Sequence, residues 1–188
     1  MDTAQRDLEH TLAYHGAPAL AGIKPADLIA WGTPQTCTSP FFQEYCTQLA
    51  LRGIQLRVMC TGRPRCLLLV YRPDQLERQL ADGAVRALLL REGYPVDQGL
   101  EAMLTALGRR LSEGSFPHEV GLFLGYPPED VEGFRIHQGR DYKLCGCWKV
   151  YSDVERARQC FRRYGLCRAA LCRRIQEGKP LVQMFRVA

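Results

Sequence analysis

Apolar residues recur at helical spacing in several segments of the chain. Leu100, Met103, Leu107 and Leu111 lie three or four residues apart. Side chains at this spacing share one face of a helix, so they predict an amphipathic helix. Spacing of this kind, or a proline at the first helical position, predicts further helical segments at residues 2–14, 27–29, 41–52, 73–91, 128–130 and 154–175. Glycines mark expected interruptions in two of these segments, at Gly83 and Gly165.

Other segments follow the patterns of strands. Residues 54–60 have a period of two and residues 66–71 are apolar on both faces, so together they predict a hairpin across the turn TGRPR. Residues 120–124 contain no polar side chain and predict a buried strand. A second hairpin is expected from residues 134–137 and 142–151, with its turn at Gly139, and an edge strand from residues 181–187.

The order of these elements indicates the fold class. Helices and strands do not alternate regularly along the chain, as they would in a doubly wound α/β fold. We therefore predict an α+β fold in which residues 1–188 form a single domain. Its core would be a mixed, mainly antiparallel sheet of about four to five strands flanked by helices.

Four segments carry a resemblance to a known family. They are PALAGIKPADL near the N-terminus, LLLVYRPDQLERQL in the middle, REGYP just after it, and the stretch from Phe116 to Asp153. Together they resemble the family called domain of unknown function 3793, a group of uncharacterised bacterial proteins, over nearly the whole chain. The resemblance implies no activity. Members of the family often carry a cysteine where this chain has Gly16, and glycine cannot act as a nucleophile.

Composition points to a cytoplasmic protein. The N-terminal residues are charged where a signal peptide would be apolar, and the longest apolar run, residues 66–71, is too short to span a bilayer, so no membrane association is expected. The nine cysteines are odd in number, and a chain of 188 residues can bury a sizeable core without disulfides. Reduced thiols are therefore expected rather than a disulfide framework.

The segment from Phe116 to Asp153 holds the best candidates for a ligand site. An imidazole beside a carboxylate, as in His118 and Glu119, can do acid–base chemistry near neutral pH, although neighbouring side chains on a strand point to opposite faces and a purely structural role is the alternative. The first hypothesis is a small-molecule or cofactor-binding protein, with enzymatic activity left open. Its pocket would be bounded by His118, Glu119, Tyr126, Lys149 and Tyr151.

The C-terminal helical segment suggests a second hypothesis. Residues 154–179 hold eight basic side chains against two acidic ones, so the formal charge of +5 is concentrated there. A face formed by Arg158, Arg162 and Arg173 could bind an acidic protein or a nucleic acid. A solvated arginine face is the alternative. Nucleic acid is the less favoured partner, because Phe161 and Tyr164 are predicted to be buried and could not stack on bases.

The cysteines suggest a third hypothesis, a thiol-based redox or metal protein. Cys145 and Cys147 form a CxC pair, whereas zinc sites usually present CxxC turns, so no metal site is predicted. The glycine-rich loops that cradle ATP or NAD phosphates are missing from the sequence. The patterns identify no cofactor and no substrate, and they leave the oligomeric state open.

Overall fold

A three-stranded antiparallel sheet lies at the centre of the molecule. The structure is a computed structural model that describes residues 3–61, 64–113 and 116–187, and it confirms the α+β class. The strands follow the order β1-β3-β2, with bounds β1 (Ala26–Trp31), β3 (Cys66–Tyr71) and β2 (Gln55–Cys60). Leu68 of β3 lies opposite Ile29 on β1 and Val58 on β2. Because β3 is paired on both edges and covered on both faces, every one of its residues is buried.

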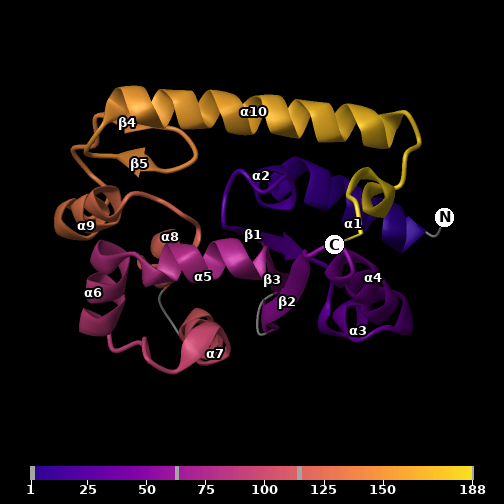
Figure 1. Ribbon diagram of the computed structural model, residues 1–188, viewed down its shortest axis with the longest axis horizontal. Coiled ribbons are helices and arrows are strands. Elements are labelled where there is room, and N and C mark those ends of the chain that lie inside the picture. Colours follow the sequence, from indigo (N-terminus) through magenta and orange to yellow (C-terminus); the bar gives the residue numbers. More distant parts are fainter. Residues whose placement is uncertain (1–2, 62–63, 114–115, 188) are drawn as a thin grey trace.

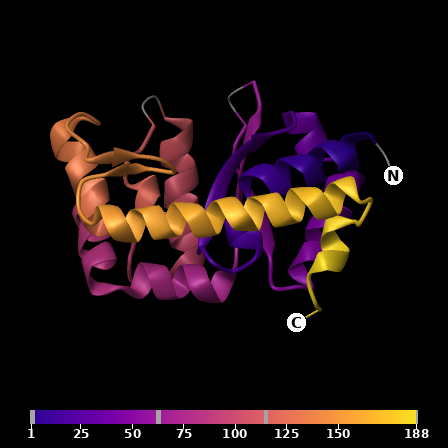
Figure 2. The same ribbon diagram turned by 90° about the horizontal axis from the view of Figure 1, so that it is seen from above.

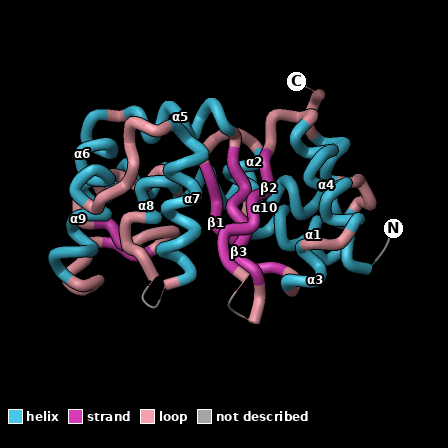
Figure 3. Tube along the Cα trace, turned by 90° about the horizontal axis from the view of Figure 1, so that it is seen from below, coloured by secondary structure: helices cyan, strands magenta, loops and turns pink. Residues whose placement is uncertain are grey.

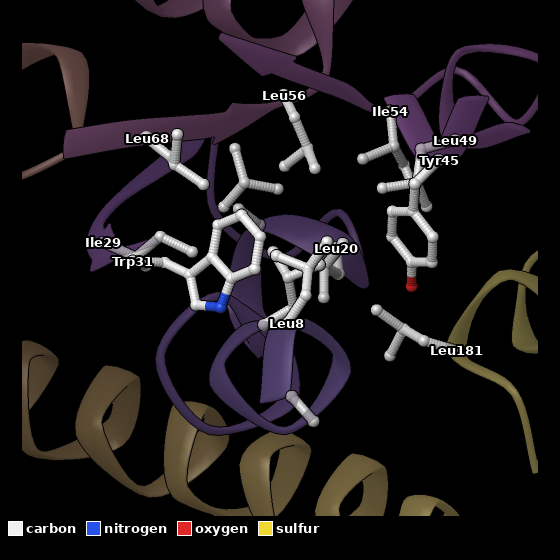
Figure 4. Close-up of a cluster of buried hydrophobic side chains, with 14 of the residues drawn as sticks. Leu8, Leu20, Ile29, Trp31, Tyr45, Leu49, Ile54, Leu56, Leu68 and Leu181 are labelled. Carbon is white, nitrogen blue, oxygen red and sulfur yellow. The ribbon is translucent and has the colours of Figure 1, made fainter. Parts of the chain in front are cut away.

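The first face of the sheet packs against the N-terminal helices and the end of the chain. These elements are α1 (Thr3–His15), α2 (Ala17–Leu20), α3 (Pro34–Cys37), α4 (Pro40–Ala50) and a 3-10 helix, η1 (Leu181–Met184). Leu8, Trp31, Leu68 and Leu181 meet in this core, as Figure 4 shows. We call this part of the molecule the sheet core.

The opposite face is covered by helices from the middle of the chain. Their bounds are α5 (Pro73–Ala81), α6 (Gly83–Arg91), α7 (Gly99–Ser112) and α8 (Val120–Phe123). Leu69 and Tyr71 of β3 point into this second core, together with Leu104 and Phe123. The sheet therefore lies between two sets of helices, which Figure 3 shows from below.

A small second sheet lies at one end of the molecule. After α9 (Pro128–His137), two strands of two residues each, β4 (Leu144–Cys145) and β5 (Lys149–Val150), pair as an antiparallel hairpin. The chain then forms α10 (Val154–Gln176), which runs from this hairpin along the molecule to α1 (Figures 1 and 2). We call residues 126–153, with the part of α10 that they pack against, the hairpin region.

The structure corrects five of the predicted elements, among them residues 142–151, which form both short strands of a hairpin, β4 and β5, instead of its second strand alone. Residues 120–124 do not form a strand: they contain the short helix α8, whose four residues are all buried, and this burial explains why no polar residue marks it as helical. Residues 134–137 belong to α9, residues 27–29 belong to β1, and residues 181–184 are 3-10 helical. The strands therefore form two small antiparallel sheets instead of one sheet of four to five strands.

The predicted breaks in the helices have different outcomes. The segment at residues 73–91 is interrupted as expected, because the Asp82 side chain accepts hydrogen bonds from the backbone N–H groups of Ala84 (3.0 Å) and Val85 (3.1 Å) and so begins a new helix. Gly165, in contrast, does not interrupt α10, which is continuous over 23 residues. The hairpin of β2 and β3 is confirmed, although residues 62–63 of the TGRPR turn lie outside the described part of the chain.

Candidate functional site

A cavity of about 350 Å³ opens between α8, α9 and the β4–β5 hairpin. Four aromatic rings line it together with an imidazole, and the remaining wall is mostly apolar. Among the described residues, the charged or acid–base side chains in its lining are His118, Asp130 and Lys149, while Cys145 adds a thiol and Tyr126 a phenol. The lining residues are Phe116, Pro117, His118, Val120, Gly121, Tyr126, Asp130, Val131, Phe134, Cys145, Gly146, Trp148 and Lys149. We call this space the aromatic cavity.

The aromatic walls are positioned by ring contacts and by close approaches to glycine. The Tyr126 and Trp148 rings are stacked, with centroids 4.9 Å apart, and Trp148 meets Phe161 of α10 edge-on at 4.6 Å. A Cβ added at Gly146 would lie 2.2 Å from the Phe161 ring, so only glycine lets the hairpin approach α10 this closely. The wall formed by Trp148 is therefore fixed from both sides.

The carboxylate of Asp130 ties the hairpin to α9. Asp130 is 2% exposed, and its Oδ2 accepts the indole N–H of Trp148 at 2.7 Å. Its Oδ1 accepts the backbone N–H groups of Tyr151 and Ser152, both at 2.8 Å. A buried carboxylate that accepts three N–H groups is satisfied as an anion. Asp130 therefore acts as a structural anchor that positions Trp148 in the cavity wall.

A buried ion pair supports Tyr126 from behind. The Lys24 ammonium contacts the Asp27 carboxylate, and its Nζ lies 5.1 Å from the centre of the Tyr126 ring. Burial raises the pKa of Asp27, although Lys24 opposes this change. Burial also raises the pKa of the Tyr126 hydroxyl, which donates to the carbonyl oxygen of Cys147 at 3.2 Å. Tyr126 is thus held as a neutral phenol between the ion pair and the cavity.

Three of the five sequence-predicted pocket residues line the cavity. His118, Tyr126 and Lys149 come together there, and the His118 ring lies 4.9 Å from that of Phe134. Glu119 points elsewhere, because its Oε1 accepts hydrogen bonds from the Tyr94 hydroxyl (3.1 Å) and Arg110 (3.0 Å). His118 and Glu119 therefore do not form an acid–base pair.

Tyr151 lies outside the aromatic cavity. Its ring stacks on that of His137 with centroids 5.4 Å apart, and it packs against the backbone of α9 at Gly133. A Cβ at Gly133 would lie 2.5 Å from this ring. The tyrosine consequently helps to hold the hairpin on α9 rather than contacting a ligand in the cavity.

Sequence reasoning missed the residues that build the site from behind. Asp130, Lys24 and Asp27 were not singled out, although the segments IKPADL and GYPPED contain them. The burial of these three side chains could not be inferred from the sequence, since charged side chains are normally solvated. The two segments meet where Gly125, at φ +75°, lies against Pro25.

The three arginines of the predicted basic face are all exposed on α10. At 100° per residue, Arg158, Arg162 and Arg173 fall within about 60° of arc around the helix axis. Arg158 lies 3.9 Å from Glu155, the nearest acidic side chain on the helix. The face is therefore strongly cationic and open to solvent.

Several of the thiols have raised pKa values. Burial raises the pKa of Cys37 to about 12 and of Cys46 to about 11, and it also raises the pKa of Cys147. These thiols stay protonated near neutral pH, whereas reactive thiols have lowered pKa values. Across residues 3–61, 64–113 and 116–187, no three His, Cys, Asp or Glu side chains are grouped so that they could hold a metal ion.

Comparison with known proteins gives one family. A family model described as "Protein of unknown function (DUF3793)" matches residues 12–185, which is most of the chain. No curated protein and no solved structure matches. Within the part of the chain that the structure describes, no helix combines the length and apolar character needed to cross a membrane.

Proposed function

The chain belongs to the family described as "Protein of unknown function (DUF3793)", and from its geometry we propose that it binds a small, planar, largely apolar molecule in the aromatic cavity. One observation carries this proposal. Trp148, Tyr126 and Phe134 line a space of about 350 Å³ in which few polar groups are present. Ligand sites commonly combine apolar and aromatic walls with a small number of placed polar groups.

Binding is favoured over catalysis by the surroundings of His118. A carboxylate often orients a histidine that acts as a general base, but the neighbouring carboxylate of Glu119 is held by Tyr94 and Arg110 instead. The one carboxylate in the cavity wall, Asp130, is saturated by three N–H donors. The polar side chains of the cavity are therefore suited to orienting a ligand rather than to moving protons.

Titration with a neutral planar probe tests this proposal. We expect 2-naphthalenemethanol to give saturable binding by ligand-observed NMR. Phe134→Ala should weaken binding about tenfold or more, because an aromatic wall that buries a ligand ring contributes more than 1.4 kcal/mol. Tyr14→Ala, which removes an exposed ring from α1, is the matched control and should leave binding unchanged.

Two results would count against the proposal. One is the lack of any saturable binding by a protein that melts cooperatively. The other is equal weakening by Phe134→Ala and Tyr14→Ala, which would indicate non-specific adhesion to exposed rings rather than a site. Near-ultraviolet circular dichroism of both variants checks that the fold is retained.

The arginine face supports a second candidate function, binding of a polyanionic partner through α10. The supporting observation is that Arg158, Arg162 and Arg173 are exposed on one side of the helix. Exchange of all three for alanine should abolish salt-dependent retention of polyglutamate or of a dT20 oligonucleotide, since each lost contact reduces counterion release. The charge-matched control exchanges three exposed arginines elsewhere, Arg78, Arg109 and Arg140. Equal loss of retention in both triple variants would show that the effect depends on net charge alone and not on this face of α10.

A further inference from the structure

We infer that the ligand of the aromatic cavity carries an anionic group, a carboxylate or a phosphate, and that the Lys149 ammonium receives it. This inference rests on the proposed function, because it concerns the same cavity. It goes further by assigning the charge of the ligand and the side chain that selects it. Four features of the cavity support it in turn.

The first feature is the fixed position of the Lys149 ammonium. Its Nζ donates to the carbonyl oxygen of Gly139 at 2.6 Å, and it lies 4.9 Å from the ring centre of Tyr142 and 5.7 Å from that of Phe134. The backbone turn that supplies this carbonyl has positive φ at Gln138, Gly139 and Asp141. These contacts restrict the lysine side chain before a ligand binds, which lowers the ordering cost of binding.

The second feature is the spare hydrogen-bonding capacity of this ammonium. An ammonium group has three N–H donors, and the Gly139 carbonyl uses one. Within the described residues Lys149 forms no ion pair, while Arg91, Arg110 and Lys24 are all paired with carboxylates. A half-buried cation without a carboxylate partner, at the wall of an apolar space, favours an anion from outside.

The third feature is that the acidic group of the cavity is already satisfied. Rings such as those of Trp148, Tyr126 and Phe134 could also surround a cationic ligand, as aromatic cages do. A cage of this kind needs a free negative charge or at least no competing cation. Asp130 is 2% exposed and accepts three N–H groups, and Lys149 places a positive charge on the same space. The charge balance therefore disfavours a cationic ligand.

The fourth feature is the separation of apolar and charged parts. The rings of Tyr126, Trp148 and Phe134 form an apolar part of the lining, and Lys149 and His118 add polar groups to it. A ligand that fits has a flat, conjugated body and one anionic substituent. Aromatic carboxylates and aryl phosphates share this chemistry, and the volume of about 350 Å³ limits the body to a few fused rings.

Three matched probes separate the effect of charge from the effect of shape. They are 2-naphthoate, 2-naphthalenemethanol and 2-naphthylmethylammonium, measured by isothermal titration calorimetry at low ionic strength, with 2-naphthyl phosphate to compare the two anion types. We expect 2-naphthoate to bind about tenfold more tightly than the alcohol, and the ammonium compound to bind most weakly. Tighter binding of the phosphate than of the carboxylate would identify the aryl phosphate as the preferred anion and would equally support the inference.

The variant Lys149→Met tests the residue assignment. Methionine keeps an unbranched apolar side chain and removes the charge, so the ratio of the affinities for 2-naphthoate and 2-naphthalenemethanol, both measured on this variant, should fall to less than twofold. Lys143→Met is the matched control. Lys143 belongs to the same hairpin segment but is exposed, donates to the Ser152 carbonyl at 3.2 Å and does not line the cavity. This variant should keep the full preference.

The outcomes distinguish the inference from the proposed function. If the alcohol binds and the naphthoate binds no better, or if the preference survives Lys149→Met, the anion assignment is wrong while the cavity remains a binding site. If Lys143→Met removes the preference for 2-naphthoate as fully as Lys149→Met does, the preference depends on net charge alone and the assignment to Lys149 is again wrong. If none of the four probes binds, the proposed function fails and the inference fails with it.

Discussion

The two tryptophans of the chain have the same hydrogen bond in very different surroundings. Each indole N–H donates to an aspartate at 2.7 Å, Trp31 to Asp7 and Trp148 to Asp130. Trp31 is 1% exposed in the sheet core, where it stacks on Phe42, and its partner Asp7 is exposed on α1. Asp130 is buried and accepts two further N–H groups. The hydrogen bond of Trp31 therefore ends on an exposed carboxylate, whereas that of Trp148 belongs to a buried group of three hydrogen bonds.

The comparison shows two ways of stabilising parts of one molecule. The sheet core is formed by three six-residue strands and by helices whose apolar faces are read directly from their spacing. The hairpin region has only two two-residue strands, which provide few ladder hydrogen bonds, so it depends on a buried carboxylate and on close glycine contacts. The candidate ligand site lies in the region that is held by these few specific contacts.

Removing the two aspartates should give the largest contrast. Asp130→Ala leaves three N–H donors without a partner, two of them on the backbone, and should lower the free energy of unfolding by about 3–5 kcal/mol. Asp7→Ala removes one hydrogen bond to an indole that apolar contacts still hold, at a cost of about 1 kcal/mol. Urea denaturation followed by far-ultraviolet circular dichroism measures both. Equal losses in the two variants would contradict the difference between the regions.

Glycine substitutions should give an intermediate effect. Gly125 has φ +75°, and a Cβ there would lie 2.6 Å from Pro25 Cδ, so Gly125→Ala should cost about 2–4 kcal/mol from backbone strain and a clash together. Gly53, at φ +68°, is the matched control because its nearest contact would be the Arg72 side chain at 3.7 Å. Gly53→Ala should cost only the backbone strain, about 1–2 kcal/mol. If thermal unfolding shows equal losses of stability in the two variants, Pro25 and Gly125 are not closely packed.

The smallest effect should be a dependence on pH. Hydrogen bonds from Arg91 and Arg135 lower the pKa of Glu132 to about 2 from its ordinary value of 4.5. A lowered pKa means that the ionised carboxylate stabilises the fold above pH 4.5, and that this contribution is lost as the pH falls towards 2. Glu132→Gln should therefore flatten the acid limb of the stability profile. Glu44→Gln, at an exposed position on α4, should leave that limb as in the parent protein.

The sequence predicted most elements that have a clear local pattern and assigned α8 and β1 to the wrong class. The apolar stripe of α7 and the interruption at Gly83 are local signals, and both are confirmed. The helix α8 has no polar residue to reveal its period, and β1 was misassigned because the pairing with β3 that makes it a strand involves residues about 40 positions away. Neither the class of an element without polar residues nor a pairing with a distant strand can be inferred from the local sequence pattern.

The site was predictable only in part, for the same reason. Its location in the segment from Phe116 to Asp153 follows from the density of aromatic residues, and three of the predicted side chains line one cavity. The anchoring role of Asp130 depends on donors 18 to 22 residues away, and the buried pair of Lys24 and Asp27 supports a tyrosine about 100 residues later. Such contacts become visible only when the fold is known.

The two indole N–H signals in a ¹H–¹⁵N correlation spectrum allow the most direct test of the account. During titration with 2-naphthoate, Trp148 reports on the aromatic cavity and Trp31, in the sheet core, serves as an internal control. We predict a saturable shift of the Trp148 signal, while the Trp31 signal stays in place. A spectrum in which neither signal moves, or in which both move together, would contradict the assignment of the aromatic cavity as the ligand site.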